Sequence, residues 1–168
     1  LRSDTSVIEI QYISDNQRKS TNLQLFPSES LNLFKEYHET SYKMLEGNIG
    51  YVTLRSIKKE DIPLIKSTLK NAQGIIIDLR DGAAEYVPYL LGSFFVSDVT
   101  PFAKVAVGNV NNPGEFQFAE VPPILPDNEP YKGKLIVLVN EFTQSMAEFT
   151  AMAFRAGENT IIIGSPTA

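Results

Sequence analysis

The chain has 168 residues, of which 43% are hydrophobic and 21% charged, so it can bury a core of ordinary domain size and does not have a disordered composition. Its net charge of −5, with no run of more than two lysines or arginines, excludes a basic surface that would attract nucleic acid or anionic lipid. Because cysteine is absent, a disulfide scaffold, a thiolate zinc site and a cysteine nucleophile are also excluded.

Two short alternating segments near the amino terminus predict a β-hairpin. Polar and apolar residues alternate along 5–13 and again along 20–26, and a polar turn at 14–17 separates the two segments. Pro27 is expected to end the second strand, because proline lacks the N–H group that strand pairing uses. A polar stretch without a clear period follows and contains His38, the only histidine of the chain.

The middle of the chain alternates predicted strands with predicted helices. Residues 49–54 predict a strand, and residues 58–71 predict a helix that Ser56 would cap. Residues 74–79 form a continuous run rich in β-branched side chains, which is typical of a strand buried on both faces. A short turn then leads to a predicted helix over 84–95.

The last part of the chain completes an alternating pattern. Residues 99–107 and 115–119 predict strands, and a proline-rich loop follows them. Residues 135–139 and 161–163 predict two more buried strands, with a helix over 144–156 between them. This alternation predicts an α/β fold around a mostly parallel sheet.

A serine stands where the strand at 135–139 passes into the next helix. In a parallel α/β sheet, ligands gather at the carboxyl ends of the strands, and the free N–H groups of a helix start can stabilise a developing oxyanion. Ser145 could therefore act as a nucleophile if a base lies nearby. Its spacing from Glu148 also matches a capping box, in which the serine only begins the helix. The local pattern leaves both interpretations open.

The turn after the strand at 74–79 offers a second candidate element. One of its N–H groups could stabilise the same oxyanion, or the turn could be an ordinary connection with Gly82 at positive φ. His38 is the only histidine that a histidine-based triad within this chain could use, although its polar neighbours suggest a solvated position.

Metal and cofactor sites are not expected. One histidine and no cysteine leave only carboxylates as metal ligands, and these are not clustered at ligand spacing. The glycines at 47 and 50 lack the rest of a phosphate-loop or dinucleotide-binding pattern.

Several motifs occur in the order and at the spacing typical of one protease family. They are the segments 47–52, 74–80, 131–134, 140–149 and 163–167. Through them, nearly the whole chain resembles the C-terminal processing (tail-specific) serine proteases, which are related to the tricorn protease core. The resemblance implies a ClpP/crotonase-like spiral α/β core with a mostly parallel sheet. It also implies that residues 28–168 are this core, truncated at its C-terminal end, and that residues 1–27 are the last hairpin of a PDZ-like domain.

The resemblance also implies a set of catalytic residues. Ser145 would be the nucleophile, and the N–H of Met146 would form the oxyanion hole with an N–H of Gly82 or Ala83. Residues 81–84 read Asp-Gly-Ala-Ala, where the family usually has an Asn-Pro-Gly-Gly type of loop. The Ser–Lys branch of the family would place a lysine base just beyond residue 168, whereas a tricorn-like arrangement would favour His38 as the base.

The implied activity is that of a serine endopeptidase, which cleaves unfolded proteins or protein C-terminal tails through a serine acyl-enzyme. A PDZ-like segment would select C-termini by adding a strand to its sheet. The altered loop at 81–84 suggests an alternative, which is a catalytically inactive relative that binds a peptide or another ligand. A crotonase-like acyl-CoA enzyme would share the fold, but no CoA-binding signal is recognisable in this sequence.

The expected partner is therefore a peptide or unfolded protein, and neither a cofactor nor nucleic acid is expected. No segment reaches the roughly 18 consecutive apolar residues that a membrane-spanning helix needs. The family resemblance points to the periplasm or cell envelope of a bacterium. The sequence does not indicate an oligomeric state.

Overall fold

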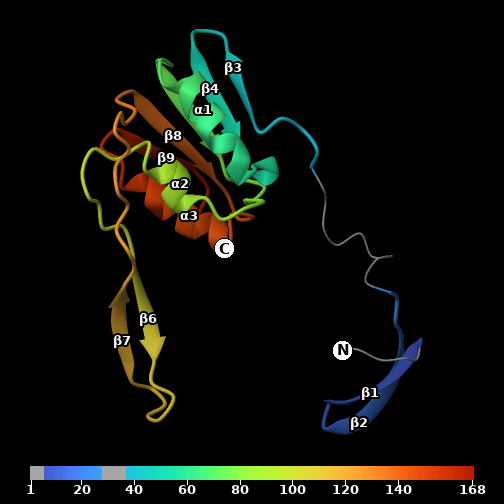
Figure 1. The fold of residues 1–168 in the computed structure, drawn as a ribbon. Helices are drawn as coiled ribbons and strands as arrows, with labels where there is room; N and C mark the ends of the chain where they lie inside the picture. Colours follow the sequence, from blue (N-terminus) through green and yellow to red (C-terminus); the bar gives the residue numbers. More distant parts are fainter. Residues whose placement is uncertain (1–5, 28–36) are drawn as a thin grey trace. The chain divides into compact units, whose positions relative to one another are not determined.

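The amino-terminal segment forms the predicted hairpin. A computed structural model describes residues 6–27 and 37–168, and the chain divides into two compact units, 1–36 and 37–168 (Figure 1). In the first unit, β1 (Val7–Ser14) pairs antiparallel with β2 (Gln17–Gln24). Asp15 and Asn16 connect the strands with φ angles of 56° and 60°, as a two-residue hairpin turn requires. The hairpin is confirmed, while its assignment to a PDZ-like domain, and the boundary at residue 27, stay predictions.

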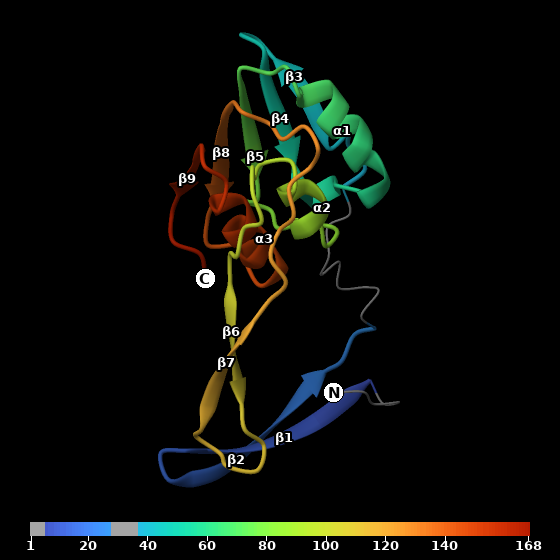
Figure 2. The same cartoon turned by 60° about the vertical axis from the view of Figure 1, so that its left-hand side comes forward.

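A five-stranded sheet forms the frame of the second unit, in the order β3–β4–β5–β8–β9 (Figures 1 and 2). β4 (Ile49–Thr53), β5 (Gly74–Asp78), β8 (Lys134–Val139) and β9 (Thr160–Gly164) run parallel, which confirms the predicted mostly parallel sheet. β3 (Tyr42–Leu45) joins antiparallel at the edge and was not predicted. As an edge strand it is largely exposed, so its sequence lacks the apolar pattern of the inner strands.

Three α-helices pack on one face of this sheet (Figures 1 and 2). They are α1 (Ile62–Leu69), α2 (Pro88–Gly92) and α3 (Met146–Arg155), and two 3₁₀ turns, η2 (Leu54–Ser56) and η3 (Lys59–Asp61), precede α1. The core lies between the helices and the sheet. Its fully buried large side chains include Leu54, Ile57, Ile65, Leu69, Ile75, Ile77, Leu79, Leu91, Ile124, Leu135 and Phe154.

Two predicted helices are shorter in the structure. Ser56 does not cap α1, because it is buried inside η2 and its hydroxyl has no hydrogen-bond partner among the described residues. The helix predicted over 84–95 shrinks to α2. Pro88 cannot extend a helix backward, because it lacks an N–H group and disfavours helical φ and ψ at Val87.

The second face of the sheet is less covered than predicted. Side chains alternate along the inner strands, so that the residues facing the helices are buried. On the opposite face of β9, Ile161 and Ile163 are 55% and 49% exposed. The prediction of a buried strand at 161–163 is therefore wrong for these two side chains.

A second hairpin extends from the core between α2 and β8 (Figures 1 and 2). β6 (Lys104–Gly108) pairs antiparallel with β7 (Phe116–Glu120), and every residue of both strands is exposed. The strand predicted over 99–107 begins later than expected, since Thr100 forms only an isolated bridge with Ile124. The base of this hairpin lies beside α3, where it contributes to a cleft described below.

Candidate active site

The predicted site residues lie at the carboxyl ends of the parallel strands. The 79–84 loop follows β5, and the loop 140–145 connects β8 to α3. β9 ends at Gly164, which pairs with Val139 at a φ angle of 146°. A Cβ atom at Gly164 would overlap the backbone carbonyl oxygen of Val139, so only glycine fits here. Parallel register thus gathers three loops at one edge of the sheet.

Ser145 has an unusual backbone conformation directly before α3. Its φ and ψ angles are 50° and −110°, in a region that residues other than glycine rarely adopt, and its side chain is exposed. Strained backbone of this kind costs on the order of 1–3 kcal/mol and clusters at functional sites. Ser145 therefore combines a strained backbone with an exposed side chain at the residue directly before the helix.

Glu148 supports this conformation from the first turn of α3. Its Oε2 accepts a hydrogen bond from the Ser145 N–H at 2.9 Å, and its Oε1 accepts one from the Thr167 hydroxyl at 2.6 Å. Ser145 and Glu148 thus have the capping-box arrangement predicted as the alternative. The contact of the Ser145 hydroxyl with the first turn of α3, however, falls outside hydrogen-bond geometry. The capping box and an accessible hydroxyl are therefore compatible.

Two of the three residues predicted as oxyanion donors have a backbone N–H without a hydrogen-bond acceptor among the described residues. One is that of Met146, the first residue of α3, as helix geometry dictates. The other is that of Ala83. The N–H groups on either side of it do have acceptors: Gly82 donates to Leu79 O at 2.9 Å, and Ala84 donates to Leu54 O at 2.8 Å. Gly82 instead shapes the turn through its φ angle of 82°. Of the two residues predicted as second donor, only Ala83 offers a free N–H.

A buried threonine ties the two loops together. Thr143 is fully buried, and its hydroxyl donates to Leu79 O at 3.0 Å while it accepts from the Asn140 N–H at 3.0 Å. The Leu79 carbonyl oxygen is the same acceptor that the Gly82 turn uses. Thr143 was not predicted as a site residue, since a threonine in a polar loop carries no signal of burial.

A carboxylate network fixes the base of the 79–84 loop. Asp78 Oδ1 accepts from the Arg80 backbone N–H at 3.0 Å and from Arg80 Nε at 2.9 Å. Its Oδ2 accepts from Arg80 Nη2 at 2.7 Å and from the Tyr51 hydroxyl at 2.8 Å. Burial raises the pKa of Asp78, but the hydrogen bonds from Arg80 and Tyr51 together outweigh it, so the pKa lies below the ordinary value. Burial and the bond to Asp78 raise the pKa of Tyr51.

Asp78→Asn is expected to lower the free energy of unfolding by about 1–3 kcal/mol at neutral pH, because hydrogen bonds to a charged acceptor are lost. Since the folded pKa lies below the unfolded one, the stabilisation is fully present above the unfolded pKa and disappears as pH falls through the folded pKa. Urea unfolding of both proteins between about pH 3 and 8 checks this. The difference should shrink below about pH 4, and a difference that grows on acidification would contradict it.

His38 lies in the exposed segment before β3. Arg55 forms ion pairs with Glu39, the residue after His38, and with Asp81. The Arg55 guanidinium also lies 4.4 Å from the centre of the Tyr37 ring. These contacts connect the segment around His38 to the 79–84 loop. Between His38 and Ser145 themselves, both of which are described, there is no hydrogen bond, so the role of His38 as base stays a prediction.

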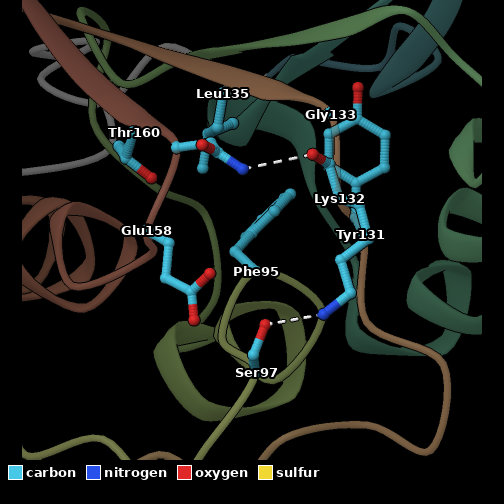
Figure 3. A pocket seen from close by; sticks show the side chains of 9 residues that line it. Phe95, Ser97, Tyr131, Lys132, Gly133, Leu135, Glu158 and Thr160 are labelled. Atoms are coloured by element: carbon cyan, nitrogen blue, oxygen red, sulfur yellow. Dashed lines mark hydrogen bonds between the residues drawn. The ribbon is translucent and has the colours of Figure 1, made fainter.

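A small enclosed pocket lies at the other end of the sheet, around the amino ends of β8 and β9 (Figure 3). Phe95, Tyr131 and Leu135 line it, and Lys132 donates to the Ser97 hydroxyl at its edge. Its volume of about 10 Å³ could hold no more than one water molecule. It is therefore not a substrate site.

Within residues 6–27 and 37–168, histidine, aspartate and glutamate side chains do not gather in threes as a metal site would need. In the same ranges, no helix has the length and apolar character to cross a membrane.

Comparison with protein families gives one match. The family profile "Peptidase family S41" matches residues 48–168, which include both loops of the site. No curated protein sequence matches the chain.

Several solved structures share the fold. A putative peptidase from Parabacteroides merdae superposes with a TM-score of 0.63 at 21% identity, covering 75% of this chain and 42% of its own. Mature CPAF in complex with lactacystin gives 0.56 at 11% identity, covering 99% and 55%. The photosystem II D1 C-terminal processing protease gives 0.51 at 14% identity, covering 89% and 40%. The chain thus spans about half or less of the length of these proteins.

Proposed function

The chain belongs to peptidase family S41, and on that premise we propose that it carries the nucleophile of a serine endopeptidase that cleaves unfolded proteins or protein C-terminal tails. The observation that supports this most is the exposed Ser145 at positive φ, between a buried strand and a helix. A structural relative named for C-terminal processing supports the tail-cleaving form of the proposal.

The two loops can supply groups that this reaction needs. The Ser145 oxygen attacks the peptide carbonyl carbon, and its proton passes to a general base and then to the leaving amine as the C–N bond breaks. The N–H groups of Met146 and Ala83 have no other acceptor among the described residues and can bind the oxyanion. Water then hydrolyses the acyl-enzyme. The base is either the lysine that the family resemblance places beyond residue 168 or His38.

The same proposal includes two wider features. A PDZ-like segment at 1–27 would select substrate C-termini, and the protein would act in the periplasm or cell envelope. Both follow from the family resemblance, and neither changes the chemistry at Ser145.

A fluorophosphonate probe tests the proposal, because it reacts only with an activated serine. We expect the full-length protein to be labelled at Ser145 and to degrade an unfolded protein such as reduced casein. Ser67→Ala, which removes an exposed hydroxyl on α1, should leave both results unchanged. Absence of labelling together with absence of degradation would overturn the proposal.

An inactive binding protein is the second candidate. The observation that favours it is the 81–84 loop, where Asp81 replaces the usual asparagine and is held by Arg55. Peptide binding that Ser145→Ala leaves unchanged, without turnover by the unmodified protein, would support this candidate.

A further inference from the structure

Two clefts meet on the exposed side of α3. The first has a volume of about 490 Å³ and the second about 410 Å³, both within the range typical of ligand sites. Met152 lines both of them, so the two clefts adjoin at its side chain. We call this feature the Met152 trough.

The first cleft begins beside Glu148, the residue that holds the candidate nucleophile. Its lining includes Glu148, whose carboxylate holds the Ser145 N–H, and Thr167, which donates to the same carboxylate. From there it passes between α3 and β9. Its remaining lining residues are Val139, Ala151, Met152, Arg155, Thr160 and Ile162.

The second cleft lies between α3 and the base of the β6–β7 hairpin. Apolar side chains form its walls, and a Lys104–Glu120 ion pair lies at its rim. The apolar lining residues are Pro101, Phe102, Ala103, Val121, Pro123 and Met152.

An aromatic wall connects the second cleft to the active-site loops. Phe102 packs edge-on against Phe149 with their ring centres 5.0 Å apart, and Phe149 stacks with Tyr86 at 6.1 Å. Tyr86 is 43% exposed and lies two residues after the 79–84 loop, while Phe149 is one helical turn beyond Ser145. A chain of aromatic side chains therefore links the segment after the 79–84 loop to the second cleft.

The helix sets the distance between nucleophile and trough. Ser145, Phe149 and Met152 are at positions i, i+4 and i+7, so they lie on one stripe of the helix. Seven residues correspond to about 10 Å along a helix axis, and an extended peptide covers this distance in about three residues.

We propose that the Met152 trough is a substrate subsite, which binds an aliphatic or aromatic side chain about three residues from the scissile bond. This inference rests on the proposed function, because Ser145 defines where the scissile bond lies. It adds a preference within unfolded substrates: segments with an apolar residue at that spacing are cleaved and segments with a charge there are spared.

The test uses the full-length protein and quenched fluorescent peptides with one fixed cleavage site. Leu, Phe, Asp or Lys is placed singly at each of the four positions on either side of that site. At one position, about three residues from the bond, Leu or Phe should exceed Asp in kcat/KM by about 10- to 100-fold, as expected for burying one apolar side chain. The other outer positions should differ little.

Variants at Met152 identify the residue responsible. Met152→Asp should abolish the apolar preference and raise kcat/KM for Lys at the same position by about 10-fold, whereas Met152→Leu should keep the preference. Leu64→Asp is the matched control, since Leu64 is also exposed and apolar, at 56% against 43% for Met152, but lies on α1.

Binding separates this inference from the proposed function. The same peptides, labelled with a fluorophore, bind to Ser145→Ala without being cleaved, and anisotropy reports their affinity. If no peptide is hydrolysed but the affinity still depends on the apolar position and on Met152, the proposed function fails, and the trough stands only as a binding site for an apolar side chain. A flat positional profile in both assays, or an unchanged profile in Met152→Asp, overturns the subsite.

Discussion

Ser145→Ala is expected to lower kcat by about 10⁴-fold or more, because it removes the atom that would form the acyl-enzyme. KM should change much less, since the peptide contacts of the loops remain. The rate of hydrolysis of an unfolded protein or a quenched peptide by the full-length protein measures the effect. A variant that keeps more than about 1% of the rate would contradict the assignment of Ser145.

Stability measurements distinguish the nucleophile from a simple helix cap. Loss of an N-cap serine typically costs about 1 kcal/mol of stability. The contact of the Ser145 hydroxyl with the first turn of α3 falls outside hydrogen-bond geometry, and the Ser145 N–H keeps its bond to Glu148 in the variant. Urea unfolding of Ser145→Ala should therefore change by less than about 1 kcal/mol. Full activity with a clear loss of stability would identify a cap instead.

Thr143→Val is expected to lower kcat by about 100-fold, since it removes the hydroxyl that ties the nucleophile loop to the 79–84 loop. It also leaves the Asn140 N–H without its acceptor, which costs about 1–3 kcal/mol, whereas the Leu79 carbonyl keeps the hydrogen bond from the Gly82 N–H. Thr143→Ser keeps a hydroxyl at the same place and should restore most of the rate. Steady-state kinetics of both variants measure kcat, and urea unfolding of both measures the loss of stability.

A core variant controls for the loss of stability. Leu69 is fully buried on α1 and packs over Gly50 near the amino end of β4, at the opposite end of the strand from the site loops. Leu69→Ala should cost about 2–5 kcal/mol of stability and leave kcat within about twofold. If Leu69→Ala lowers kcat as much as Thr143→Val does, the effect of Thr143 is one of general stability rather than of loop positioning.

The inner strands could be predicted because their residues leave few alternatives. The runs at 74–79 and 135–139 are continuous and rich in β-branched side chains, and both are inner strands of the sheet. β3 carries Lys43 and lies at the edge, where solvent accepts polar side chains, so its sequence resembles a loop. The helix over 84–95 was predicted too long because its apolar residues also suit a buried loop around Pro88.

Only those parts of the candidate site that depend on local sequence could be predicted. The position of Ser145 and Met146 at a strand-to-helix junction could be predicted from the sequence, while their catalytic roles rest on the family resemblance and stay predictions. The choice between Gly82 and Ala83 depends on which N–H the turn already uses, and only the bond from Gly82 to Leu79 reveals that. Thr143 acts through two long-range hydrogen bonds, which leave no pattern in the sequence.

The pairing of Gly164 with Val139 restricts how this sequence can diverge over evolution. Any side chain at 164 would collide with the backbone of β8, and no repacking of neighbouring side chains can relieve a collision with main-chain atoms. A protein that retains this strand register must therefore retain glycine at 164, even while the loops around it drift to suit new substrates.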